Sequence, residues 1–438
     1  MSRLLCAVLA LCGIEVLSAQ TFTTVLSFDG ANGNSPQAAL IQGGDGNLYG
    51  TTGLGGTHKP PYRNAAPGTI FRITPSALET LHNFCLRGAC AANGDIPTAG
   101  LVQAANGDLY GVTEQGGAYP GYYGHGGGTA FKLSDSGGLT TLYNFCAQAG
   151  CADGEFPEAA LIFAGDGNFY GTTYGGGNER DCVGGCGTVF KIAPSGVLTT
   201  LHVFSVKDGN GYGSSPSGLV QGADGNFYGT TPDGGVNLSG SVFKITPSGT
   251  LSTIYSFCVN DYPYCTDGAV PLAGLIEGTD GNLYGAARAG GLNGGPNSAG
   301  GGTVFRITPA GAFTTLYEFC SQANCADGSA PETALIEASD ESFYGTTIQG
   351  GTYGRGTIFR ITPAGALTVL YSFCAQSNCA DGMDPRAALL QASNGDLYGT
   401  TSSGGAYCPQ NLYPGCGTVF RLSLGLVPPV NTRPSLIF

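Results

Sequence analysis

Tyrosine, arginine and histidine side chains lie in irregular glycine-rich loops of this sequence, where they could form a ligand-binding surface. A tyrosine ring covers the apolar face of a sugar while arginine and neighbouring polar groups meet its hydroxyls. The alternative is that the tyrosines fold back onto their own loops, and the absence of tryptophan removes the strongest stacking group. The sequence predicts binding of a glycan or an extracellular protein through Tyr62, Arg63, Tyr119, Tyr122, Tyr123, His125, Arg180, Arg288, Tyr353, Arg355 and Tyr407.

Groups for catalysis are sparse, and no catalytic residue is predicted. The chain has four histidines: His58 and His125 lie in loops, whereas His82 and His202 occupy strand positions. No nucleophile-elbow G-x-S-x-G motif occurs. Glu158 and Glu332 precede strands and are expected to face a channel mouth, but a glycosidase pair needs a separation of about 5–10 Å. A binding module is therefore favoured, with an extracellular carbohydrate-active enzyme or a structural surface or matrix component as alternatives.

Cysteine spacing predicts local disulfides. Apart from Cys6 and Cys12, the cysteines form seven close pairs, isolated from one another by long stretches of chain. A zinc site is disfavoured because no histidine accompanies the pairs and their spacing varies. Disulfides indicate an oxidising compartment. The predicted pairs are Cys85/Cys90, Cys146/Cys151, Cys182/Cys186, Cys258/Cys265, Cys320/Cys325, Cys374/Cys379 and Cys408/Cys416.

An Asp-Gly step follows several of these pairs, at Asp153, Asp267, Asp327 and Asp381. Carboxylates in loops are calcium ligands in many proteins. Recurrence of this position in every repeat favours turn formation instead, because an Asx side chain caps its own loop. No metal or other cofactor is predicted, and calcium is the alternative.

Internal repetition predicts the fold. A Tyr-Gly step, a phenylalanine in a G-[TS]-x-F element and a second phenylalanine each recur seven times, and repeats of about 60 residues are typical of propeller blades. The Tyr-Gly steps begin at Tyr49, Tyr110, Tyr170, Tyr228, Tyr284, Tyr344 and Tyr398. The phenylalanines are Phe71, Phe131, Phe190, Phe243, Phe305, Phe359 and Phe420, followed by Phe28, Phe84, Phe145, Phe204, Phe257, Phe319 and Phe373.

Each repeat has four strand-like segments. The first, such as 36–41, is rich in small residues that suit a crowded centre, and an Asp-Gly pair after it predicts a type I′ hairpin turn. In the sixth repeat 340–342 lacks this glycine and predicts a looser hairpin. Residues 21–28 match only a fourth strand, whereas 385–423 supply only three. We therefore expect an all-β, seven-bladed β-propeller with four antiparallel strands per blade, the last blade closed by the N-terminal strand.

Antiparallel strands sort the connections onto two faces. The second-to-third and fourth-to-first connections share one face and contain the paired cysteines and the candidate binding residues. Loops on a rigid scaffold carry binding residues more often than the scaffold itself. This face is the expected working face.

The order of glycine pair and aromatic residues in each unit is similar to kelch repeats. The chain more closely resembles the bacterial tandem-repeat family of GloVer repeats, with its LYGTT, GG, GTVFKITPSG and LTTLYSF elements. The resemblance covers nearly all of the chain after its leader. It implies a surface or secreted location and no established catalytic residues.

Charge and the N-terminus limit the partners and the location. The formal net charge of −13 disfavours nucleic acid and anionic membranes as partners. Residues 1–19 have the pattern of a secretory signal peptide. We expect 20–426 to form the propeller and 427–438 a tail, with no membrane span and a secreted or cell-surface location. The sequence does not define an oligomeric state.

Overall fold

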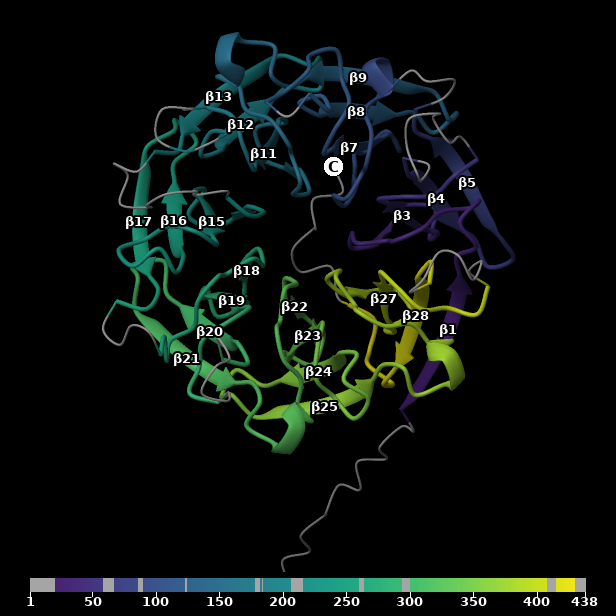
Figure 1. Cartoon of the computed structure of the whole chain (residues 1–438), viewed down its shortest axis with the longest axis vertical. Helices are drawn as coiled ribbons and strands as arrows, with labels where there is room; N and C mark the ends of the chain where they lie inside the picture. The colour runs from purple at the N-terminus through teal and green to yellow at the C-terminus, as the bar shows by residue number, and fades with distance from the viewer. Residues whose placement is uncertain are drawn as a thin grey trace, which may run out of the picture.

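The computed structural model describes residues 20–57, 67–85, 90–122, 124–177, 182, 184–205, 216–259, 264–293, 300–407 and 415–429. Seven four-stranded antiparallel sheets are arranged in a ring around a central axis (Figure 1). The predicted signal peptide lies outside the described residues. Among the described residues, no helix has the length and apolar character needed to cross a membrane.

The strands follow one order from the centre of the ring to its rim. Blades 1 to 3 consist of β2 (Ile41–Gln42), β3 (Leu48–Thr52), β4 (Thr69–Ile73), β5 (Leu78–Asn83); β6 (Val102–Gln103), β7 (Leu109–Thr113), β8 (Thr129–Leu133), β9 (Leu139–Asn144); and β10 (Ile162–Phe163), β11 (Phe169–Thr173), β12 (Thr188–Ile192), β13 (Leu198–Val203). Blades 4 to 6 consist of β14 (Val220–Gln221), β15 (Phe227–Thr231), β16 (Ser241–Ile245), β17 (Leu251–Ser256); β18 (Ile276–Glu277), β19 (Leu283–Ala287), β20 (Thr303–Ile307), β21 (Phe313–Glu318); and β22 (Ile336–Glu337), β23 (Phe343–Thr347), β24 (Thr357–Ile361), β25 (Leu367–Ser372). Blade 7 consists of β26 (Leu390–Gln391), β27 (Leu397–Thr401), β28 (Thr418–Ser423) and β1 (Thr21–Ser27).

Short helical turns follow the outer strands. They are the helix α1 (Cys90–Asn93) and the 3-10 turns at Ala149–Cys151, Ala323–Cys325 and Ser377–Cys379. All four lie in fourth-to-first connections and contain a paired cysteine.

The N-terminal strand closes the ring, as the sequence predicts. β1 pairs antiparallel with β28, from Thr21 opposite Ser423 to Ser27 opposite Thr418. Figure 1 shows β1 beside β28 in this blade. The last sheet thereby gains its outer strand, and pairing removes an edge that would otherwise be open.

The recurring phenylalanines form the cores between blades. Phe145 of blade 2 meets Phe190 of blade 3 edge to face, with ring centroids 5.1 Å apart, and the same contact recurs at the other junctions. Both residues are fully buried. The Tyr-Gly step has its reason here, because a Cβ on Gly171 would lie 2.6 Å from Cζ of Phe190. Only glycine leaves room for the ring.

Small residues bring the blades together near the axis. A Cβ on Gly100 of blade 2 would lie 3.4 Å from Cβ of Ala160 in blade 3. The predicted first strand is longer than the observed one, because of 36–41 only Ile41 belongs to β2. The rest of this segment lines the centre without pairing as a strand.

The predicted type I′ hairpin turn is wrong. Gly46 has φ +81°, but Asp45 is not among the residues with positive φ, and Gly46 N–H donates to the carbonyl of Gly43. This is a three-residue loop with a bulge at glycine. The looser hairpin predicted at 340–342 is also wrong, because Glu341 takes the glycine's place at φ +59° with the same hydrogen bond to Ala338.

Candidate functional site

One position in each repeat, the residue after the proline that precedes the inner strand, lies at the mouth of the central channel. The residue before the proline has a positive φ in all six described repeats, between 55° and 57°, so the chain makes the same bend each time. Six of the seven positions line a single cavity of about 260 Å³ on the cysteine-bearing face. The seven residues are Gln37, Thr98, Glu158, Ser217, Leu272, Glu332 and Arg386; Ser217 does not line the cavity, and Glu114 does.

On one side of this cavity, the basic wall, the lining residues are Glu332 of blade 6 and Arg386 of blade 7, and Arg288 of blade 5 is joined to them through Glu332. Arg288 Nε lies 2.7 Å from Oε1 of Glu332, and Arg386 Nη1 donates to Oε2 of Glu332 at 2.8 Å. Only 10% of the Glu332 side chain is exposed, against 46% and 42% for the two arginines. Because each carboxylate oxygen holds a different guanidinium, Glu332 fixes both arginines in place.

Blades 2 and 3 form the opposite, acidic wall. Glu158 is exposed as a whole residue, whereas its carboxyl group is partly surrounded by protein atoms at the mouth. This partial burial, followed by repulsion from Glu114, raises the pKa of Glu158 to about 7. Two of the three glutamates that line the cavity therefore differ: Glu332 is paired with two arginines, whereas Glu158 is largely neutral below pH 7.

This pair does not resemble a glycosidase couple. Glu158 and Glu332 do face the same cavity, as the sequence suggests. A retaining or inverting hydrolase needs a second carboxylate free to attack carbon or to activate water. Both oxygens of Glu332 are instead bonded to arginines. Glu332 therefore does not supply the free second carboxylate that a glycosidase pair with Glu158 would need.

Among the predicted binding residues that the structure describes, Arg288 is connected to this site through its ion pair with Glu332. Tyr119, Tyr122, Tyr353 and Tyr407 are exposed, by 41%, 49%, 51% and 73%, but do not line the cavity. Tyr122 N–H donates to Glu155 Oε2 at 2.7 Å, which ties its loop to the next blade junction. The tyrosines form parts of a rim and not one cluster.

The remaining predicted residues divide into two groups. His125 and Arg355 are exposed, and Arg355 lies near the carboxyl group of Asp384, whose pKa is raised by burial and lowered again by Arg355 and Arg386. Tyr62, Arg63, Tyr123 and Arg180 lie outside the described residues.

Sequence reasoning missed Arg386, Glu114, Gln37, Thr98 and Leu272. A signal was present, because the residue after the recurring proline changes from repeat to repeat, although the residue before the proline varies as well. This position becomes visible only when the seven repeats are aligned and their variable positions are compared. Looking for chemically conspicuous loops did not reveal it.

Six of the predicted disulfides are formed: Cys85–Cys90, Cys146–Cys151, Cys182–Cys186, Cys258–Cys265, Cys320–Cys325 and Cys374–Cys379. Cys416 is also disulfide-bonded, and its predicted partner Cys408 lies outside the described residues. The cysteines therefore serve as cross-links, as predicted, rather than as zinc ligands.

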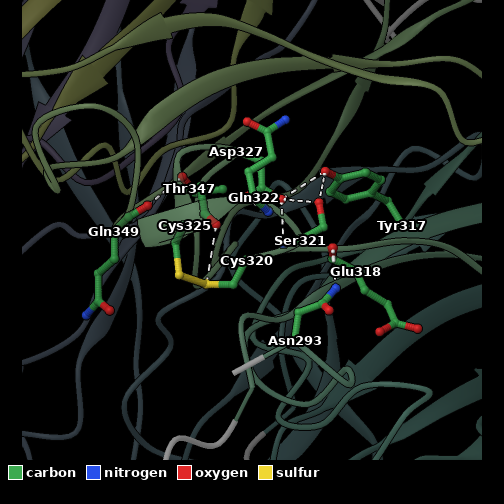
Figure 2. Close-up of a disulfide and its surroundings, with 11 residues drawn as sticks. Asn293, Tyr317, Glu318, Cys320, Ser321, Gln322, Cys325, Asp327, Thr347 and Gln349 are labelled. Atoms are coloured by element: carbon green, nitrogen blue, oxygen red, sulfur yellow. Dashed lines mark hydrogen bonds between the residues drawn. A yellow bond between two sulfur atoms is a disulfide. The ribbon is translucent and has the colours of Figure 1, made fainter. Parts of the chain in front are cut away.

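The Asp-Gly carboxylates cap the disulfide loops. Asp153 is fully buried and accepts hydrogen bonds from Ala147 N–H, Gln148 N–H and Tyr143 O–H at 2.8 to 3.0 Å. Figure 2 shows the equivalent arrangement around Asp327, next to Cys320–Cys325. These oxygens are occupied by protein donors, which supports the predicted turn-forming role.

The repeat that ends at Phe204 lacks the usual cysteine pair after its fourth strand and has a disulfide, Cys182–Cys186, in its second-to-third connection. Cys186 stands where other repeats have glycine, as at Gly127, and a Cβ on Gly127 would lie only 2.8 Å from Cβ of Cys146. In the Cys186 repeat, the closing Phe204 is followed by Ser205 in place of a cysteine. Cys186 packs against the Phe204 core. A short disulfide loop is thus found in the second-to-third connection of this repeat instead of the fourth-to-first connection.

Fold and site together define a disulfide-bonded, seven-bladed β-propeller with an asymmetric polar mouth at the centre of its loop-rich face. The chain belongs to the Gloeobacter/Verrucomicrobia repeat family, whose model matches residues 15–123, 67–296 and 292–427. This confirms the resemblance seen in the sequence motifs. The sequence matches none of the curated proteins with which it was compared.

The chain is similar to solved structures at low sequence identity. PorZ, a bacterial surface component of the type-IX secretion system of Porphyromonas gingivalis, is 13% identical with a TM-score of 0.52, and the match covers 91% of this chain and 47% of PorZ. A luciferin-regenerating enzyme is 12% identical with a TM-score of 0.42, over 75% of this chain and 92% of that one. These similarities concern the fold alone.

Proposed function

We propose that the protein is a secreted binding module that holds an extracellular glycan at the mouth of its central channel. One observation carries the proposal. The scaffold repeats nearly unchanged, yet the position after the proline is Gln, Thr, Glu, Ser, Leu, Glu and Arg in successive blades. The six of these positions that line one cavity carry five kinds of side chain, and they convert a nearly symmetric ring into an asymmetric site.

The surroundings of the mouth favour a binding role. Most of the exposed large apolar side chains lie on loops of the same face, where tyrosine and aliphatic groups can contact the C–H faces of sugars. They are Tyr119, Tyr122, Tyr174, Val236, Leu238, Val259, Tyr264, Leu272, Leu292, Tyr353 and Tyr407. An extracellular location is supported by the disulfides and by the signal-like N-terminus.

The test is a glycan array probed with the intact protein and two matched variants. Leu272→Arg places a long charged side chain in the mouth, whereas Val197→Arg makes a similar change at an exposed position of the opposite face. We expect glycan binding to be lost in the first variant and retained in the second. Binding that survives Leu272→Arg would move the site elsewhere, and an array without any bound glycan would contradict the proposal. Release of new reducing ends from a bound polysaccharide would favour the enzyme alternative.

A further inference from the structure

We propose that the mouth recognises an acidic sugar, with Arg288 and Arg386 binding its carboxylate and the opposite wall meeting its hydroxyl groups. This inference rests on the proposed function and specifies the class of ligand. It is argued from the two walls of the cavity and from its size.

The basic wall is preorganised for a carboxylate. Glu332 neutralises one of the two guanidiniums, so the trio keeps a net positive charge. A guanidinium has five N–H donors in a planar fork that matches a carboxylate, and one contact with Glu332 leaves most of them for a ligand. Both arginines are nearly half exposed and already held in position. Ordering them on binding therefore costs little.

The opposite wall suits hydroxyl groups better than a second charge. Gln37 and Thr98 are uncharged hydrogen-bonding groups, the neutral form of Glu158 both donates and accepts, and the carboxyl oxygens of Glu114 can accept hydrogen bonds from hydroxyl groups. A ligand ammonium group would instead favour a fully ionised carboxylate at this place. Leu272, which is 37% exposed, adds an apolar surface for sugar C–H groups. This combination favours a sugar acid over an amino acid.

The volume limits how much of the ligand enters. Pockets for drug-sized ligands usually enclose about 300–1,000 Å³, whereas this cavity has about 260 Å³. It accommodates one sugar residue, and the rest of a longer glycan would lie over the rim of the loop-rich face. We therefore expect recognition of a single uronic acid residue in a chain.

The experiment measures binding of a galacturonic acid trisaccharide, its methyl ester and the neutral galactose trisaccharide by calorimetry at low and at physiological salt. The ester removes only the charge of the carboxylate. Arg288→Gln and Arg386→Gln are compared with Arg360→Gln, which breaks the ion pair with Asp340 on the opposite face. We expect the acid to bind at least about tenfold more tightly than the ester, with the difference lost in the two mouth variants and reduced by salt. Arg360→Gln should bind as the unchanged protein does.

Failure of the acidic-sugar inference can be distinguished from failure of the proposed glycan binding. Equal binding of acid, ester and neutral sugar, unaffected by the mouth variants, would overturn the acidic-sugar inference and leave glycan binding standing. Failure of every sugar here and on the glycan array would overturn both. Tighter binding of free amino acids than of the galacturonic acid trisaccharide would also contradict the inference.

Discussion

The backbone N–H of Ser393 donates a hydrogen bond to the side-chain oxygen of Gln42 at 2.7 Å, although the two residues are 351 positions apart. Equivalent bonds join neighbouring blades elsewhere, for example from Thr279 N–H to Glu337 at 2.8 Å and from Ser339 N–H to Gln391 at 3.0 Å. The junction between the first and last blades is therefore built like an ordinary junction. The first prediction concerns this closure.

Replacing Phe22 with alanine should weaken the closed ring. Its ring stacks on Tyr371 at 3.7 Å and lies 5.5 Å from Phe420, so it anchors β1 between two blades. We expect the free energy of unfolding to fall by about 3 kcal/mol in a denaturant titration, as for other large-to-small aromatic changes. Val25→Ala, in the same strand but 39% exposed, is the control. Equal losses in both variants would argue against an anchoring role for Phe22.

Asp153→Ala should destabilise the loop of the Cys146–Cys151 disulfide. The change removes the acceptor for two backbone N–H groups and the Tyr143 hydroxyl in a fully buried position. Leaving such donors unsatisfied costs about 2–3 kcal/mol of unfolding free energy. Asp135→Ala, on an exposed turn of the other face, should change it little. An unaltered stability in Asp153→Ala would show that the disulfide alone holds the loop.

His82 should make the protein sensitive to mild acid. Burial lowers its pKa from 6.5 to about 4, and its Nε2 is buried with no hydrogen-bond partner within the described structure. The unfolded chain takes up this proton first, so the stabilising contribution is complete above pH 6.5 and is lost as pH falls towards 4. The loss is at most about 3 kcal/mol by the conversion of 1.36 kcal/mol per pKa unit.

The His82→Tyr variant tests this pH dependence. Tyrosine occupies the equivalent place in other repeats, as at Tyr143. Melting temperatures measured between pH 4 and 7.5 should fall less steeply with acid in the variant than in the unchanged protein. Parallel curves for the two proteins would assign the acid sensitivity to other groups.

Glu158 should have the opposite effect on stability. Its raised pKa means that the folded protein holds a proton that the unfolded chain releases at lower pH. Its contribution is therefore complete below pH 4.5 and is lost as pH rises through about 7. Glu158→Gln should flatten the pH dependence of unfolding free energy between those values and make the protein relatively more stable above pH 7. A variant that loses stability at every pH would contradict this.

The repeats allowed the architecture to be predicted because each structural requirement recurs in the chain. Phe190 is paired with a glycine at Gly171, and the cysteines of each close pair are near neighbours in sequence. Local geometry was less predictable. The hairpin at Asp45–Gly46 uses a bulge rather than a type I′ turn, and Glu341 adopts the glycine conformation because its flanking strands fix the turn.

The candidate site was predictable only in part. Tyrosine-rich loops drew attention to the correct face, but those tyrosines are spread around its rim. Arg288, Glu332 and Arg386 come from three blades and lie about 50 residues apart in sequence, so no local pattern links them.

The sequence by itself determined the number of blades, the closing strand and the cross-links, because these depend on motifs that recur at fixed spacing. Only the tertiary structure decided the functional groups at the mouth. Closing the ring brings one variable side chain from each blade to the axis, and the charge state of Glu158 and the pairing of Glu332 depend on neighbours in space.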